Sequence, residues 1–207
     1  MIKFFISLFL VATLASAEEM GTKPGSCILS QDGPITVSFK AYKTPAKIGV
    51  GGIFDSVKYT ANAPKGNNFR EILVGSNVVI DTASVNSKNS GRDVKLVKFF
   101  FEQMSSKNIT AKIVDIKSDK RVRGKPKTGV MLVAITMNGK TKEVPMSYIF
   151  KKGDLSANGH IDLLDFSASK ALASINKACF DLHKGKTWSD VAIGFQTNIK
   201  FELCHVK

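Results

Sequence analysis

The stretch VAIGFQTNIKFEL, residues 191–203, alternates between two kinds of side chain along its whole length. One set of alternate residues, from Val191 to Leu203, is apolar or branched, and the residues between them are small or polar. A period of two places the two sets on opposite faces of one long β-strand. An antiparallel strand with one apolar and one wet face is typical of a β-sandwich or β-barrel. The stretch therefore predicts an all-β fold, whose interior holds either its own side chains alone or a ligand.

Similar patterns recur before this strand and are separated by short turns. Asn138-Gly139 is the strongest turn signal, because this pair favours a two-residue hairpin. Pro145 indicates an edge or a bulge in the strand that contains it, since proline lacks the N–H that a strand ladder needs. Without a linker or repeat in the chain, we expect one domain of eight strands with minor α-helix. The predicted strands are residues 35–42, 51–60, 70–85, 108–118, 130–137, 143–151, 159–166 and 191–203.

Two segments have helical spacing, residues 92–105 and 168–184. Ser167 is a suitable N-cap for the second helix, and Gly185 is a suitable residue to follow its end. Apolar residues form one stripe along this helix, so we expect it to lie against the sheet or across one end of a barrel. The residues of the stripe are Ala171, Leu172, Ile175, Ala178, Cys179 and Leu182.

The first seventeen residues have the form of a secretory signal peptide. Lys3 precedes a short apolar run, residues 4–14, and Ala15-Ser16-Ala17 provides a small-x-small cleavage site. We expect cleavage after Ala17, which leaves residues 18–207 as one domain in the periplasm or outside the cell. No later apolar stretch approaches the length of a membrane span.

The chain is strongly basic, with a formal net charge of +13 at pH 7. Such a charge favours anionic partners, either phospholipid headgroups or nucleic acid, although scattered lysines also make an ordinary solvated exterior. Residues 117–127 concentrate the basic side chains in what we interpret as a loop between strands. Export and the lack of aromatic residues in this loop disfavour nucleic acid, so contact with an anionic membrane surface is the partner that the charge leaves open.

Three cysteines allow at most one internal disulfide in an exported protein. Cys27 precedes the first strand and Cys204 ends the last, and these strands would pair in a closed antiparallel barrel. A Cys27–Cys204 bridge is therefore one prediction. A bridge that involves Cys179 of the helical stripe, or no bridge at all, are the alternatives.

Motifs of catalysis and of cofactor or metal binding do not emerge from the sequence. The Gly-Lys-Thr triplets at 139–141 and 185–187 lack the preceding glycine of a phosphate-binding loop. His160, His183 and His205 have no metal-ligand spacing, and no Gly-x-Ser-x-Gly is present. We therefore predict no catalytic residues, no metal and no cofactor. The fourteen phenylalanines fit a packed core or an apolar cavity sized for one ligand.

Three segments resemble the YceI-like family. They are TASVN at 82–86 with GRDVKL at 91–96 and the pair Phe99-Phe100, ITMNGKTKEV at 135–144, and GIF at 52–54. The resemblance implies a lipocalin-like antiparallel barrel capped by one or two helices, with an elongated cavity for a polyisoprenoid or another long-chain amphiphile. It also implies a periplasmic location and, as in some members, a homodimer; it implies no catalytic residues.

Together, these observations predict a periplasmic protein that sequesters or carries a long-chain lipid. A structural or interaction module with a filled core is the main alternative, and a hydrolase or isomerase on the same barrel is another. The side chains that we expect to contact the lipid are the inward residues of the strands, namely Phe39, Phe54, Ile80, Ile113, Phe195, Ile199 and Phe201.

Overall fold

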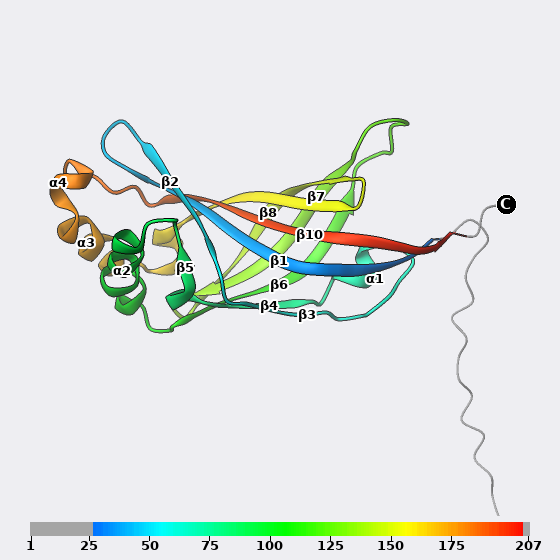
Figure 1. Ribbon diagram of the computed structural model, residues 1–207, viewed down its shortest axis with the longest axis horizontal. Coiled ribbons are helices and arrows are strands. Elements are labelled where there is room, and N and C mark those ends of the chain that lie inside the picture. The colour runs from blue at the N-terminus through cyan, green and yellow to red at the C-terminus, as the bar shows by residue number, and fades with distance from the viewer. Residues whose placement is uncertain (1–26, 205–207) are drawn as a thin grey trace, which may run out of the picture.

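Residues 27–204 are described by the computed structural model, without the side chains of residues 203 and 204. One antiparallel sheet contains all ten strands in the order β3-β4-β6-β7-β8-β9-β10-β1-β2-β5, and it curls around a single elongated interior (Figure 1). The strands are β1 (Cys27–Lys43), β2 (Ile48–Phe54), β3 (Val57–Thr60), β4 (Asn77–Asp81), β5 (Val85–Asn86), β6 (Asn108–Ser118), β7 (Lys127–Met137), β8 (Lys140–Lys151), β9 (Asp154–Asp162) and β10 (Asp190–Cys204).

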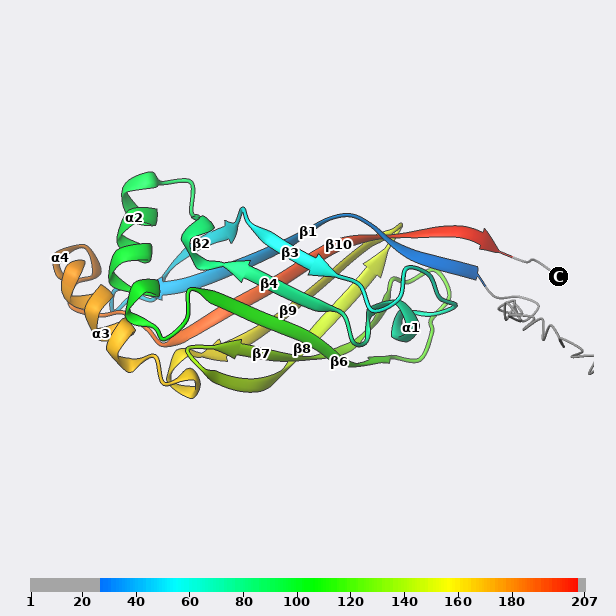
Figure 2. The ribbon, with the colours of Figure 1, turned by 90° about the horizontal axis from the view of Figure 1, so that it is seen from below.

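The helices are short and lie near the two ends of this sheet (Figure 2). The α-helices are α1 (Phe69–Leu73), α2 (Ser90–Phe99), α3 (Ser169–Ala178) and α4 (Phe180–His183). Three 3₁₀ turns, η1 (Thr82–Ser84), η2 (Phe101–Gln103) and η3 (Leu163–Phe166), complete the regular structure.

The prediction of eight strands was wrong in number, because two of the expected strands are interrupted. β2 is separated from β3 at residues 55–56, and β4 is separated from β5 by η1. The pairing continues across these breaks: Asp55 donates its N–H to the Ser84 carbonyl at 3.0 Å, and Asp81 donates its N–H to the Ser56 carbonyl at 3.1 Å. The two ends of the sheet order, β3 and β5, therefore meet where the breaks coincide. Asp81 also accepts from the N–H of Ala83, and such local bonds draw backbone groups out of the ladder.

Residues 70–85, which we expected to be one strand, contain α1, a turn, β4, η1 and β5. The Asn68 side chain caps α1 by accepting from the N–H of Glu71 at 3.0 Å. Gly75 then adopts a φ of +90°, a conformation that favours glycine, and the chain reverses into β4. The second segment that differs is 159–166, where β9 ends at Asp162 and η3 follows.

The two predicted helical segments are helical in the structure, but their first and last residues differ from the predicted ones. Residues 92–105 contain α2 and η2, and residues 168–184 contain α3 and α4, which are separated at Cys179. Ser167 is not the N-cap: Ala168 takes that place without a side-chain hydrogen bond, and Ser167 adopts a left-handed conformation after η3. Gly185 follows α4 with a φ of +74°, as expected of a residue beyond a helix end.

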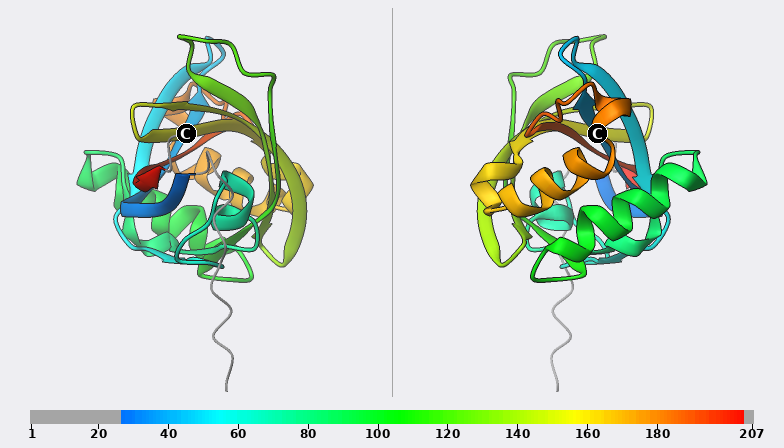
Figure 3. Two further views of the ribbon diagram at one scale, coloured as in Figure 1. Left: turned by 90° about the vertical axis from the view of Figure 1, so that its right-hand side faces the viewer. Right: turned by 90° about the vertical axis from the view of Figure 1, so that its left-hand side faces the viewer.

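The two ends of the interior differ. At one end α1 lies inside the curled sheet (Figure 3, left), and its Phe69, Ile72 and Leu73 are almost fully buried. Tyr148 of β8 and Leu155 of β9 are also buried to 1% and 0% exposure, and the Phe69 ring meets that of Tyr148 edge to face at 6.1 Å. At the other end α2, α3 and α4 lie across the opening (Figure 3, right). We call these the packed end and the helical end.

The first and last strands of the fold pair with each other. The β1–β10 register runs from Cys27 opposite Cys204 to Lys40 opposite Ala192, with irregularities at Ile28/Leu29 and Asp32/Thr36. Cys27 is disulfide-bonded and Cys179 is a free, buried thiol. The side chain of Cys204 lies outside the described residues, so the Cys27–Cys204 bridge stays a prediction. The predicted signal peptide, residues 1–17, also lies outside the described residues.

We predict that peptide mapping without reduction will find Cys27 joined to Cys204 and Cys179 as a free thiol. The bridge would close a loop of most of the chain, and such loops contribute roughly 4–5 kcal/mol to stability in the chain-entropy model. Recovery of Cys179 in a disulfide with either partner would contradict the pairing.

Close packing at the packed end gives a second prediction. A Cβ atom on Gly129 of β7 would lie 2.0 Å from the Lys117 carbonyl and 2.7 Å from the Tyr148 ring. Gly129→Ala should therefore destabilise the protein by about 1–3 kcal/mol in denaturant unfolding. Gly51→Ala is the matched strand control, because its Cβ would meet only the Phe39 carbonyl at 3.5 Å. Equal stability of the two variants would show that β7 packs against β6 and β8 more loosely than described.

Candidate functional site

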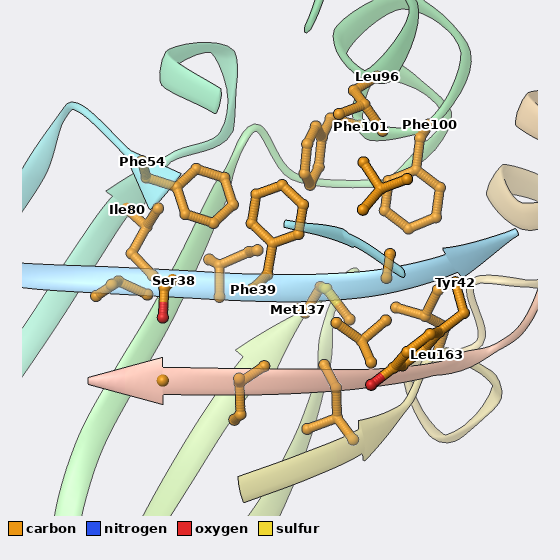
Figure 4. A pocket seen from close by; sticks show the side chains of 18 of the residues that line it. Ser38, Phe39, Tyr42, Phe54, Ile80, Leu96, Phe100, Phe101, Met137 and Leu163 are labelled. Atoms are coloured by element: carbon orange, nitrogen blue, oxygen red, sulfur yellow. The ribbon is translucent and has the colours of Figure 1, made fainter. Parts of the chain in front are cut away.

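An apolar cavity of about 590 Å³ occupies the interior toward the helical end. Strand side chains form its walls, and α2, η2 and α3 cover it (Figure 4). A chain of aromatic rings runs along one wall: Phe39 lies 5.6 Å from Phe54, Phe54 lies 5.9 Å from Phe101, and Phe101 lies 5.1 Å from Phe100. The wall exists because alternate residues of each strand point inward and are predominantly apolar.

Five of the seven side chains expected to contact a ligand line this cavity. They are Phe39, Phe54, Ile80, Ile113 and Phe195. Ile199 is 2% exposed and outside the cavity lining, and Phe201 is 46% exposed with its ring 5.8 Å from that of Phe150. The strand period identified their face correctly, but β10 extends beyond the cavity, so these two residues do not reach it. The contacts themselves stay predictions.

Several lining residues were not among the expected contacts. Met131 and Met137 of β7 alternate with outward-facing residues, and this period could have identified them. Leu172 and Ile175 belong to the apolar stripe of the second helical segment. This stripe lies over the cavity, across one end of the barrel, which is one of the two positions predicted for it. Phe101 follows the helix and had no pattern of its own to identify it.

The charged side chains that line the cavity are all basic among the described residues. Lys43, Arg92 and Lys95 are lining residues, as is His183, and neither Asp nor Glu is among them. Leu182 of α4 also lines the cavity, yet it is 61% exposed to solvent. A side chain that faces both the cavity and solvent marks an opening. The cavity therefore opens at the helical end, beside basic groups.

Arg92 is held in place by the turn that precedes α2. Its guanidinium donates from Nε to Ser87 Oγ at 2.7 Å and from a terminal nitrogen to the Ser87 carbonyl at 3.0 Å. The Asp93 carboxylate accepts from the N–H of Ser87 at 2.9 Å. Asn89 completes the cap by accepting from the N–H of Arg92. This network orients the guanidinium at the cavity lining and satisfies the buried Ser87.

His183 sits in a second network at the opening. Its Nδ1 lies 2.6 Å from Thr187 Oγ1, and Thr187 donates its only hydroxyl hydrogen to Asn176 Oδ1 at 2.8 Å. Thr187 must therefore accept from His183, which places a hydrogen on Nδ1. Burial lowers the pKa of His183 below its ordinary value of 6.5, and the positive charges of Lys43 and Lys95 lower it further.

A family model described as the YceI-like domain matches residues 33–203. The chain belongs to the YceI-like family. Several solved structures share its fold at low sequence identity. A polyisoprenoid binding domain from Saccharophagus degradans is 13% identical, covers 84% of this chain and 98% of its own, and has a TM-score of 0.55.

Two further solved structures share the fold of this YceI-like chain. Campylobacter jejuni YceI protein is 18% identical with a TM-score of 0.51, covering 94% of this chain and 99% of its own. Burkholderia cenocepacia BcnA is 15% identical and has a TM-score of 0.50. The match covers 80% of this chain and 96% of BcnA. No curated protein matches the sequence.

Within residues 27–204, no helix is long and apolar enough to cross a membrane. Groups of three or more His, Cys, Asp or Glu side chains gathered for a metal are also absent from this part of the YceI-like chain.

The lowered pKa of His183 predicts a pH dependence of stability. In the unfolded chain His183 takes up a proton near pH 6.5, whereas in the folded protein it does so only at lower pH. The contribution of His183 to the free energy of unfolding is therefore present above pH 6.5 and is lost as the pH falls through the folded-state pKa. Lys95→Met should raise the pKa of His183 in an NMR titration and reduce this loss. Lys98→Met, also on α2, is the control, and an equal shift in both variants would contradict the assigned cause.

Proposed function

We propose that the protein binds one polyisoprenoid or other long-chain amphiphile, with the chain inside the cavity and the polar group at the helical end. The observation that carries this proposal is the shape and lining of the cavity: apolar along its length, bounded by the packed end and open beside basic side chains. A single long chain fits such an interior better than a compact polar molecule does, because few polar groups are present to replace its hydration.

Burial of the chain would supply most of the affinity. Apolar surface contributes about 25 cal/mol per Å² removed from water, and part of this gain offsets the lost freedom of a flexible chain. An anionic polar group would gain further from Lys43, Arg92 and Lys95, which lie at a partly dehydrated opening where charge interactions are stronger than in bulk water. We therefore expect a phosphate or carboxylate head to be preferred over an alcohol.

The role as a carrier in the periplasm is part of the same proposal. The predicted signal peptide and the family membership support export, and the Saccharophagus neighbour is described as a polyisoprenoid binding domain. A protein that shields a long chain from water can hold or move it between membranes. An exported location and a long-chain ligand are the two requirements of that role.

The geometry favours binding over catalysis. Thr187 is the hydroxyl beside His183, and its proton is already directed at Asn176, so His183 does not act on it as a base. Arg92 and Asp93 are engaged with Ser87 and hold the turn before α2. The filled-core alternative conflicts with the volume of the cavity. A binding role uses the groups as they are arranged.

A matched pair of alanine substitutions tests the proposal. Ala111 of β6 lines the cavity, whereas Ala134 of β7 occupies the opposite face of the sheet between inward residues. Ala111→Phe should occupy part of the cavity and weaken binding of a dansylated long-chain fatty acid and a fluorescent prenyl phosphate at least tenfold, about 1.4 kcal/mol. Ala134→Phe should leave both affinities unchanged. Equal affinities in both variants, or no binding by the wild type, would contradict the proposal.

A further inference from the structure

The most exposed large apolar side chains of the described residues lie on the helices beside the opening. Val94 of α2 is 65% exposed, Leu182 of α4 is 61% exposed, and Phe180 of α4 is 58% exposed. Ile48, at the start of β2, adds a fourth at 53%. Both helices and the β1–β2 turn face outward at the helical end (Figure 3, right). Large apolar groups left in water on one end of a protein indicate a contact surface.

The same end is strongly basic. The turn at residues 43–48, helix α2 and residues 169–188 contain nine Lys and Arg residues against two Asp. One of these acidic residues, Asp93, is engaged with Ser87. Lys47 and Lys186 lie over the Trp188 ring at 5.0 and 4.7 Å, so cationic and aromatic groups are interleaved at this end. Basic and apolar side chains together match the interfacial region of an anionic bilayer, which offers phosphates at its surface and acyl chains just below.

The surface is continuous with the cavity opening. Leu182 contributes to both, and Lys95, which lines the cavity, is next to Val94 on α2. Lys95 also acts electrostatically on His183, the last residue of α4, which links the two helices around the opening. A bilayer in contact with the exposed residues would therefore lie directly against the opening.

We propose that the helical end of the protein docks on an anionic phospholipid bilayer through α2, the exposed faces of α3 and α4, and the β1–β2 turn. The exposed apolar side chains enter the interfacial region, and the lysines contact lipid phosphates. A second copy of the chain is the less suitable occupant, because a symmetric contact would bring two strongly basic faces together. Docking does not depend on which ligand occupies the cavity.

The basic hairpin between β6 and β7 provides an internal control. It projects from the sheet away from the helices (Figure 1) and contains Arg121 and Arg123 with one exposed apolar residue, Val122, at 54%. Residues 119–126 hold four Lys and Arg against one Asp, so the hairpin is at least as densely basic as the helical end, but the apolar side chains that would enter a membrane are fewer. If charge alone caused binding, the hairpin would compete with the helical end.

The test is flotation of the purified exported protein with phosphatidylcholine vesicles and with vesicles of phosphatidylcholine and phosphatidylglycerol in equal parts. We expect binding to the anionic vesicles only. Phe180→Ser with Leu182→Ser removes two apolar side chains from the surface, and Lys98→Glu with Lys177→Glu separately removes two basic ones. Each double variant should weaken partitioning at least about tenfold. For the basic pair, each residue near an anionic surface contributes roughly a factor of five. The matched controls are Val122→Ser and Arg121→Glu with Arg123→Glu, which should bind like the wild type.

Three results would overturn the proposal. The first is that the wild type does not bind anionic vesicles, and the second is that only the hairpin variants lose binding. The third is that the helical-end variants change in sedimentation but not in flotation. That third result would assign the surface to a contact with a second copy of the chain. Thermal unfolding of every variant checks the fold, and these substitutions at exposed positions should leave it intact. Titration with the fluorescent fatty acid, measured in parallel on the Lys98→Glu, Lys177→Glu variant, keeps docking separate from ligand binding: loss of flotation with retained affinity supports docking alone.

Discussion

The pairing of the first strand with the last is the contact on which the rest of the structure depends. β1 and β10 run antiparallel along most of their lengths, and the inward residues Val37, Phe39, Ile193 and Phe195 of these two strands line the cavity. Without this pair the sheet would have two long exposed edges, which favour aggregation, and the apolar wall would face water. Backbone hydrogen bonds from Asp55 and Asp81 join the two ends of the sheet order elsewhere, but the opposite ends of the chain must meet before any interior exists.

The interior of the curled sheet has two parts along its length, a cavity toward the helical end and a filled core at the packed end. Met146 of β8 lines the cavity, whereas Tyr148, two residues farther along the same face, packs against Phe69 of α1. On β10 the change comes between Phe195 and Ile199. Each long strand thus serves as a cavity wall at the helical end and as ordinary core at the packed end. One end supplies the stability, and the other can remain hollow and carry basic groups at its opening.

The sequence pattern predicted which face of each strand points inward. It could not predict which inward residues lie beside the cavity and which lie beyond it. The alternation in residues 191–203 identifies Phe195, Ile199 and Phe201 equally, although only Phe195 reaches the cavity. The missed helix α1 has a different cause: five residues are too few for helical periodicity, and the run from Phe69 to Ile80 is apolar enough to resemble a strand. Its conformation depends on the Asn68 cap and on burial inside the sheet, which is a tertiary effect. The strand breaks at residues 55–56 and at η1 likewise depend on hydrogen bonds between distant segments.

The central claim is that the hollow end holds one long-chain lipid. Native mass spectrometry of the protein, purified from its own cells without detergent, tests this claim most directly. The account predicts a population heavier than the polypeptide by the mass of one long-chain amphiphile, lost on denaturation and recovered in an organic extract of the same sample. A polypeptide mass alone, in a preparation that also fails to bind an added prenyl phosphate or fatty acid, would contradict it.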